Sequence, residues 1–301
     1  MQLNQLRSLV AIADAGSISA AARELGVSQP AVTRALRQLE IDVKASLVYR
    51  SSSGAVLTGY GTALVSHARL MLKAADKADQ HISQMVEARG GTLSIASSAT
   101  PFMIVLPRAL AMVRRQFPGL SVRLQEVVYP TVLELFRDGS IDFAIGPEPA
   151  EGLGENYSCQ PLLDVELVVV LRRGHPLAKL KSLEGLANLN WILAGPKNGP
   201  GAVHERAFRD AGIQPPQFLT NCESVSAAVY FVAHSDAASF VPRPIAASLE
   251  ESGLVTIVEV ADSIPMVKVS LMQPTNSILT PAGQAFYSAI CSVGRTFARA
   301  V

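Results

Sequence analysis

The feature that most constrains this chain is an apolar repeat that continues without a break from Leu64 to Met85. Its members alternate at intervals of four and three residues, with no glycine or proline after Gly61: Leu64, Ala68, Met71, Ala75, Ala78, Ile82 and Met85. A repeat of about 3.5 residues is typical of a helix that pairs with another helix in a coiled coil. It predicts a linker helix over residues 59–89 that dimerises the chain. The alternative is a single helix that packs on its own domain.

Ahead of this repeat, residues 1–58 form a small head with two short helical segments and a tight turn between them. The first segment runs through residues 20–24, and Gly26 supplies the backbone freedom that a helix end needs. Ser28 is the candidate N-cap of the second segment, and Pro30 is tolerated in its first turn because proline has no amide hydrogen to lose. The second segment should turn one side to the core, at Val32, Leu36 and Leu39.

The opposite side of this second helix has the side chains that read a DNA major groove: Gln29, Thr33, Arg34 and Arg37. Arg34 is expected to contact a base or a phosphate, whereas Arg37 is as readily a solvated or glutamate-paired charge. The head has six Lys and Arg against four Asp and Glu, and the whole chain has a net charge of +1. DNA binding must therefore come from local charge and from the pairing of two heads.

Two further segments of the head support this motif. Residues 2–15 predict an amphipathic helix whose apolar face packs on the two short helices. After Glu40, two short apolar runs flank a Ser/Gly turn and predict a hairpin, or wing. Arg50 and the hydroxyl-rich turn around Ser53 are expected to meet phosphates there.

After a break at residues 89–91, strands and helices alternate. Strands are expected at 92–95, 122–127, 143–145, 167–171, 191–193 and 238–241, and helices at 106–116 and 130–137. This alternation predicts an α/β domain over residues 90–301 with helices on both faces of a parallel or mixed sheet. Segments rich in proline and glycine predict chain crossings between two lobes, residues 92–161 plus 268–301 and residues 162–267.

Composition narrows the class of protein. The chain is 49% hydrophobic and 17% charged, as in soluble globular proteins. Its three cysteines have no disulfide or zinc spacing, which favours a reducing cytoplasm, and no apolar run is long enough for a membrane span. Hydrolase, metalloprotease and phosphate-loop motifs are missing, and the five histidines are scattered. The sequence predicts no catalytic residue, metal ion, cofactor or membrane partner.

The order of these elements resembles the LysR-type transcriptional regulators, and the matches extend over essentially the whole chain. In the head they are Ala21-Ala22, Leu25, residues 28–33 (SQPAVT), Leu36, Leu39-Glu40, Leu47, Arg50, Leu57-Thr58 and Gly61. Beyond the head they are Leu106-Pro107, Phe117-Pro118, residues 139–145 (GSIDFAI), residues 174–177 (GHPL) and residues 240–242 (FVP). So many spaced matches are far more specific than a helix-turn-helix pattern alone.

The resemblance implies a winged helix-turn-helix, a linker helix that pairs subunits, and a two-lobed effector-binding domain similar to periplasmic solute-binding proteins. It implies a homodimer or a homotetramer with double-stranded promoter DNA, RNA polymerase and a small-molecule effector as partners. The DNA-binding positions it implies are Ser28, Gln29, Pro30, Thr33, Arg34, Arg37, Arg50 and Ser53. Val48 and Ser53 depart from the family, which commonly has Phe and a basic residue there, so weak wing contacts are expected. Residues 234–236 (HSD) replace a usual Gly-rich turn.

Two strand-to-helix junctions, which face each other across the cleft in the family fold, predict the effector site. Residues 97–101 (SSATP) place Thr100 as N-cap and Pro101 at the first helical position, and free amides with hydroxyls suit an anion. Residues 194–201 add bare backbone and one cation. A small carboxylate or similar organic anion is expected, with Ser98 and Thr100 as principal ligands, although both hydroxyls could instead serve only as caps. The full predicted set is Ser97, Ser98, Thr100, Pro101, Phe102, Tyr129, Pro147, Lys197 and Asn198.

The competing function is a small-molecule binding or transport protein of the periplasmic-binding type. That function would require a signal peptide and leaves residues 1–58 without a role, and a hydrolase is a more distant third.

Overall fold

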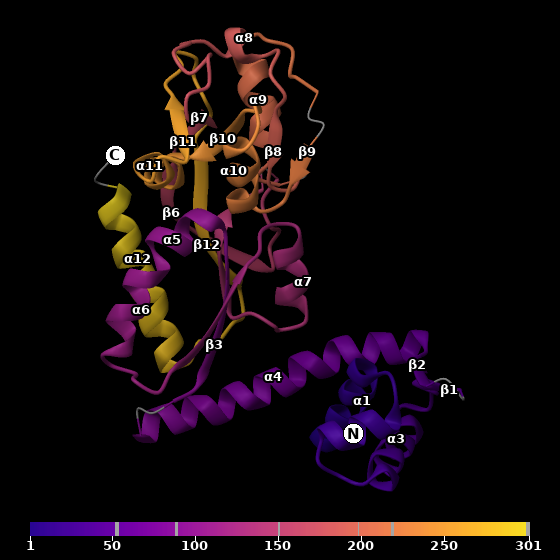
Figure 1. Ribbon diagram of the computed structural model, residues 1–301. Coiled ribbons are helices and arrows are strands. Elements are labelled where there is room, and N and C mark those ends of the chain that lie inside the picture. The colour runs from indigo at the N-terminus through magenta and orange to yellow at the C-terminus, as the bar shows by residue number, and fades with distance from the viewer. Residues whose placement is uncertain (52–53, 88–89, 150, 198, 218–219, 299–301) are drawn as a thin grey trace. The chain divides into compact units, whose positions relative to one another are not determined.

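The computed structural model describes residues 1–51, 54–87, 90–149, 151–197, 199–217 and 220–298 (Figure 1). The chain folds into two compact units. One consists of Met1–Val86 with Arg137–Ser140, and the other, here called the α/β unit, consists of Glu87–Phe136 with Ile141–Val301. None of the described helices is long and apolar enough to cross a membrane.

The first unit has the predicted order of elements: α1 (Leu3–Ala15), α2 (Ile18–Glu24), α3 (Gln29–Val43), β1 (Val48–Ser51), β2 (Gly54–Leu57) and α4 (Gly59–Glu87). The wing strands pair antiparallel, with Val48 opposite Leu57. The expected side of α3 is buried at Val32, Leu36 and Leu39, where it packs with the apolar face of α1. The winged helix-turn-helix is therefore confirmed.

Ser28 occupies the N-cap position of α3, but its side chain makes no capping hydrogen bond, so the predicted hydroxyl cap is wrong. An N-cap side chain accepts from the second or third amide of a helix. Here the second residue is Pro30, which has no amide hydrogen, and the third, Ala31, donates its amide to the Ser28 carbonyl at 2.9 Å. Ser17 does cap α2, accepting from the Ala20 amide at 3.1 Å.

The apolar repeat in α4 divides into two parts. Leu64 and Ala68 pack into the core of the head, as the single-helix alternative requires. Met71 and Ile82 further along are 42% and 62% exposed. The side chain of Met85 lies outside the described residues. Of the described members of the repeat, the later ones, Met71 and Ile82, are therefore available to a partner helix.

The first lobe of the α/β unit is built on a five-stranded sheet of order β4-β3-β5-β12-β6. Its strands are β3 (Thr92–Ser97), β4 (Ser121–Glu126), β5 (Phe143–Pro147), β6 (Tyr157–Val165) and β12 (Val267–Pro274). β3 pairs parallel with β4 and β5, and β12 pairs antiparallel with β5 and β6. The short α5 (Ala99–Ile104) follows β3.

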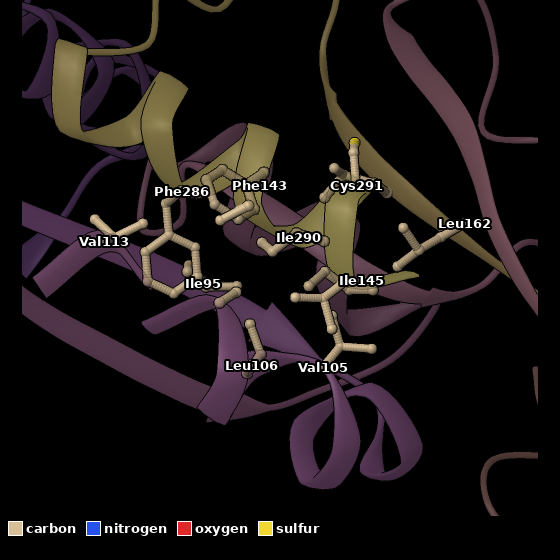
Figure 2. Close-up of a cluster of buried hydrophobic side chains, with 14 of the residues drawn as sticks. Ile95, Val105, Leu106, Val113, Phe143, Ile145, Leu162, Phe286, Ile290 and Cys291 are labelled. Atoms are coloured by element: carbon tan, nitrogen blue, oxygen red, sulfur yellow. The ribbon is translucent and has the colours of Figure 1, made fainter. Parts of the chain in front are cut away.

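Helices cover both faces of this sheet. α6 (Leu106–Arg114) and α12 (Pro281–Ala298) lie side by side on one face, as Figure 1 shows. Figure 2 shows their side chains meeting those of the strands in the main core, among them Leu106, Val113, Phe286 and Ile290 against Ile95, Phe143 and Ile145. α7 (Thr131–Arg137) packs on the other face through Val132 and Phe136.

The second lobe has a three-stranded sheet of order β10-β7-β11. Its strands are β7 (Leu167–Arg172), β10 (Ser239–Pro242) and β11 (Val255–Val258). A parallel pair, β8 (Ile192–Ala194) and β9 (Thr220–Cys222), joins it through a bridge between Trp191 and Ala238. One apolar cluster involves α8 (Leu183–Leu186) and α9 (Ala202–Asp210), and another involves α10 (Val225–Ala233) and α11 (Arg243–Glu251).

The chain passes between the lobes at two neighbouring points. β6 continues to Val165, beyond the boundary predicted at residue 161, and β12 begins at Val267, next to the boundary predicted at 268. Val165 and Val267 are partners in the antiparallel ladder. The turn at residues 234–236 is held by the Ser235 hydroxyl, which donates to the Phe231 carbonyl at 2.7 Å, and by an ion pair of Asp236 with Arg172 at 2.7 Å.

Candidate functional site

The solvent-facing side of α3 carries the predicted DNA-binding side chains. Gln29, Pro30, Arg34 and Arg37 are exposed, and Thr33 is half-buried. Among the described residues, neither guanidinium has an ion pair, so both remain available to an acceptor on DNA. The Gln29 amide oxygen accepts from the Ser19 hydroxyl at 3.2 Å, which orients the first residue of the helix.

The wing is described only in part. β1 and β2 confirm the predicted hairpin. Ser53 and the side chain of Arg50 lie outside the described residues, so their predicted phosphate contacts stay predictions.

A cavity of about 420 Å³ lies between the lobes of the α/β unit. The first lobe contributes the start of α5 and the end of β4, and the second contributes residues at the carboxyl ends of β8 and β9. Apolar side chains of the crossing strands form part of its wall, among them Val165, Val267 and Val269. A volume of this size suits a small organic ligand.

Three of the nine predicted effector residues line this cavity: Ser98, Thr100 and Pro147. Both hydroxyl-bearing residues are buried, with 9% of Ser98 and 4% of Thr100 exposed. Within the described part of the chain, neither hydroxyl has a hydrogen-bond partner. Both are therefore available to a ligand.

The other predicted residues do not line the cavity. The Ser97 hydroxyl donates to the Ser98 carbonyl at 3.0 Å, Pro101 is buried, and Phe102 packs against the main core. The Tyr129 side chain packs with the cluster around Phe136. Lys197 is exposed and pairs with Glu205 at 3.3 Å, and Asn198 lies outside the described residues.

The predicted capping at the first junction is also wrong. Ser98, not Thr100, is the N-cap of α5, and Pro101 is the third helical residue. The Ser98 side chain makes no capping hydrogen bond. The helix begins earlier because the Phe102 amide donates to the Ser98 carbonyl at 3.1 Å, which makes Ala99 the first helical residue.

At the second junction, three backbone amides are already engaged in hydrogen bonds within the chain. The amides of Gly195, Gly199 and Gly201 each donate to a backbone carbonyl at 2.8–3.0 Å. Gly199 also allows close approach of the first lobe, because a side chain there would meet the Tyr129 carbonyl oxygen at 2.6 Å. These three amides are therefore not available to a ligand.

Sequence reasoning missed five polar residues of the cavity wall, of which three are ionisable: Glu126, His204 and Glu223. Glu126 ends β4, opposite Ser97 in the parallel ladder. Glu223 follows β9, whose last residue, Cys222, pairs with Ala194. For the two glutamates, the available signal was a polar residue at the carboxyl end of a strand or directly after it, since the carboxyl ends of neighbouring parallel strands meet at one edge of a sheet. His204 lies on α9 and gave no such signal.

His204 on α9 is 2% exposed and stacks edge-on against Phe240, with ring centroids 5.4 Å apart. Burial lowers the pKa of His204 to about 3, although a hydrogen bond with the backbone of Ala194 opposes the shift. The imidazole is therefore neutral at neutral pH and adds no positive charge to the cavity wall.

Comparison with known families covers almost all of the chain. Residues 3–62 match the bacterial regulatory helix-turn-helix protein, lysR family, and residues 87–293 match the LysR substrate binding domain.

Individual relatives agree over both parts. The HTH-type transcriptional regulator GbpR of Azospirillum brasilense is 27% identical over 86% of this chain and 76% of its own length. A Mycobacterium avium protein described as "Probable hydrogen peroxide-inducible genes activator" is 30% identical over 83% of this chain and 81% of its own.

A solved structure of CbnR, a LysR family transcriptional regulator, matches the fold with a TM-score of 0.73 at 24% identity, over 98% of this chain and 99% of that one. The structure of full-length CbnR with its target DNA gives a TM-score of 0.74 at 24% identity, over 97% and 100%.

Proposed function

The chain is a member of the LysR family of DNA-binding transcriptional regulators, and from this premise we propose that a small ligand in its interlobe cavity controls how α3 binds promoter DNA. The observation that carries the proposal is the interlobe cavity, whose wall has two buried hydroxyls without partners among the described residues, in the same chain as the exposed helix α3. A transport component would leave that helix without a role.

On the DNA side, Gln29, Thr33 and Arg34 contact base edges or adjacent phosphates, and Ser28, Pro30 and Arg37 lie at the margin of the same surface. This assignment is supported by the exposure of α3 and by its two guanidinium groups, which have no ion pair with any described residue. Arg50 and Ser53 add wing contacts to phosphate. A bidentate arginine contact discriminates between bases by about 1–3 kcal/mol, whereas a phosphate contact mainly positions the protein.

The test is a mobility-shift assay on the DNA that flanks the protein's own coding region. Arg34→Ala should weaken specific binding about tenfold or more, in line with loss of a base contact. Arg206→Ala, which removes an exposed arginine of the α/β unit, is the matched control and should bind as the wild type does. Absence of salt-sensitive specific binding by the wild type would count against the proposal.

The assembly we propose is a homodimer through the exposed part of the α4 repeat, with a homotetramer as a dimer of dimers. RNA polymerase is the further protein partner, and the site of action is the cytoplasm, where promoter DNA lies. The family of regulators and the exposed apolar residues of α4 support this assembly.

On the ligand side, Ser98 and Thr100 are the contacts that the sequence predicted and that line the cavity. Isothermal titration of Ser98→Ala and Thr100→Val with an effector found by thermal-shift screening tests them, because a ligand that binds only the folded state raises apparent stability. Unchanged effector affinity in both variants would remove them from the site.

A further inference from the structure

The cavity wall is poor in positive charge. Among the described residues that line it there is no lysine or arginine, and its one histidine is buried and neutral. The nearby cation, Lys197, pairs with Glu205 instead. Within the described lining, the formal charges are the carboxylates of Glu126 and Glu223.

Most backbone donors at the two junctions are already engaged. Exceptions among the described residues include the first-turn amides of α5, at Ala99 and Thr100, where no side chain caps the helix. At the second junction the amides of Gly195, Gly199 and Gly201 all donate to carbonyls of the chain. At the first junction the Ser98 amide donates to the Ile145 carbonyl at 2.8 Å. α5 itself has only six residues, so it offers few aligned peptide dipoles to an anion.

The buried hydroxyls of Ser98 and Thr100 can hydrogen-bond a ligand in the cavity, and each can accept as well as donate. Each lines the cavity, is at least nine-tenths buried, and has no partner among the described residues. A hydroxyl oxygen has two acceptor lone pairs, and an ammonium group has three donors and no acceptor. Two hydroxyl oxygens and a carboxylate match those three donors.

From this charge and donor pattern we infer that the cavity takes a small organic cation, an amine whose ammonium group faces Glu126 and Glu223 and whose carbon chain lies on the valine walls. This inference rests on the proposed function and names the ligand class of the same site. Neither carboxylate has an ion pair within the described part of the chain, so both are available.

The two carboxylates belong to different lobes, and this gives the ligand a way to act. Glu126 ends β4 in the first lobe, and Glu223 follows β9 in the second. Without a cation their like charges repel each other, and a cation between them replaces this repulsion by attraction to both lobes. A ligand that binds the closed arrangement more tightly shifts the population toward it.

The experiment is isothermal titration of the full-length protein with three four-carbon probes that differ in charge. Putrescine carries two ammonium groups, γ-aminobutyrate carries one ammonium and one carboxylate, and succinate carries two carboxylates. Putrescine should bind at least about tenfold more tightly than succinate, in line with the strength of charge-assisted hydrogen bonds. Benzylamine and benzoate form a second matched pair with a larger apolar body, and benzylamine should bind more tightly.

Variants of the two glutamates test whether their carboxylates contact the bound amine. Glu126→Gln and Glu223→Gln keep the shape of each side chain and remove its charge, so each should weaken amine binding at least about tenfold. Both residues are exposed, so neither change should prevent folding. Glu155→Gln, at an exposed carboxylate outside the cavity, is the control and should bind the amines as the wild type does.

Three results overturn the inference: no binding by either amine, tighter binding of succinate or benzoate, or amine affinity that is the same in wild type, Glu126→Gln and Glu223→Gln. If a carboxylate binds and alters the mobility shift on operator DNA, the proposed function stands and only the ligand class falls. If the protein binds no DNA specifically with or without ligand, the proposed function falls whatever the cavity binds.

Discussion

At the scale of single residues, Gly61 occupies a place in the first turn of α4 where no side chain fits. A Cβ atom there would lie 2.0 Å from the Leu47 carbonyl oxygen. Gly61→Ala should therefore destabilise the head by about 1–3 kcal/mol, the usual cost of overpacking, and weaken DNA binding. Thermal unfolding and the mobility shift measure both effects. Gly59→Ala, two residues earlier with nothing within 4 Å, should leave both unchanged.

His204 makes the stability of the α/β unit depend on pH. Its pKa falls from an ordinary value of 6.5 to about 3 on folding, so below pH 6.5 the unfolded chain binds a proton that the folded chain does not. The contribution of neutral His204 to the free energy of unfolding should be fully present above pH 6.5. It should decrease as the pH falls toward 3, by about 2 kcal/mol between pH 7 and pH 5.

Urea unfolding at the two pH values measures this loss. His204→Phe, which keeps an aromatic ring against Phe240, should remove most of it. His234→Gln, at an exposed histidine, should retain it. If the wild type and His204→Phe lose the same unfolding free energy between the two pH values, groups other than His204 cause the pH dependence.

At the scale of elements, continuous apolar runs gave reliable predictions. β3, β5 and β7 are largely buried, and each lies within a few residues of its predicted position. β6 and β12 were not predicted, since β6 contains Pro161 and neither strand has an unbroken apolar run over its full length. Their pairing depends on contacts more than one hundred residues apart in sequence, such as that of Tyr157 with Pro274, which no local pattern reveals.

The α4 repeat shows a different limit of sequence reasoning. Its spacing is the same throughout, but Leu64 and Ala68 cover the head while Ile82 is 62% exposed. Ile82→Lys should therefore separate the dimer without disturbing the core of the head, because it puts a charge into the paired helices. Light scattering with size-exclusion chromatography should show the mass of one chain. Ser83→Lys adds the same charge one position away and should remain a dimer; a dimeric Ile82→Lys would place the interface elsewhere.

At the scale of the whole molecule, a net charge of +1 means that DNA affinity must come from the number of heads that bind together. The logarithm of the binding constant decreases with the logarithm of salt concentration in proportion to the phosphates contacted. The wild type should show about twice the slope of Ile82→Lys on the same operator. Equal slopes would mean that one head makes all the phosphate contacts.

The cavity is also a feature of the whole molecule, because residues of both lobes line it. Ser98 and Thr100 were predictable because they follow a buried strand directly. Glu126 and Glu223 lie far apart in the sequence and in different lobes, and only the order of the strands brings both to one cavity. The sequence also does not show which loop amides already donate to a carbonyl, as those of Gly195, Gly199 and Gly201 do.

The pairing of Val165 with Val267 indicates where the second lobe could be removed or replaced. The chain leaves the first lobe and re-enters it at adjacent ladder positions, about 5 Å apart as in any antiparallel pair. The second lobe is thus an insertion whose ends already meet. A tight turn between these two valines would close the first lobe as a continuous chain, and a different insert of matching end spacing could be grafted there.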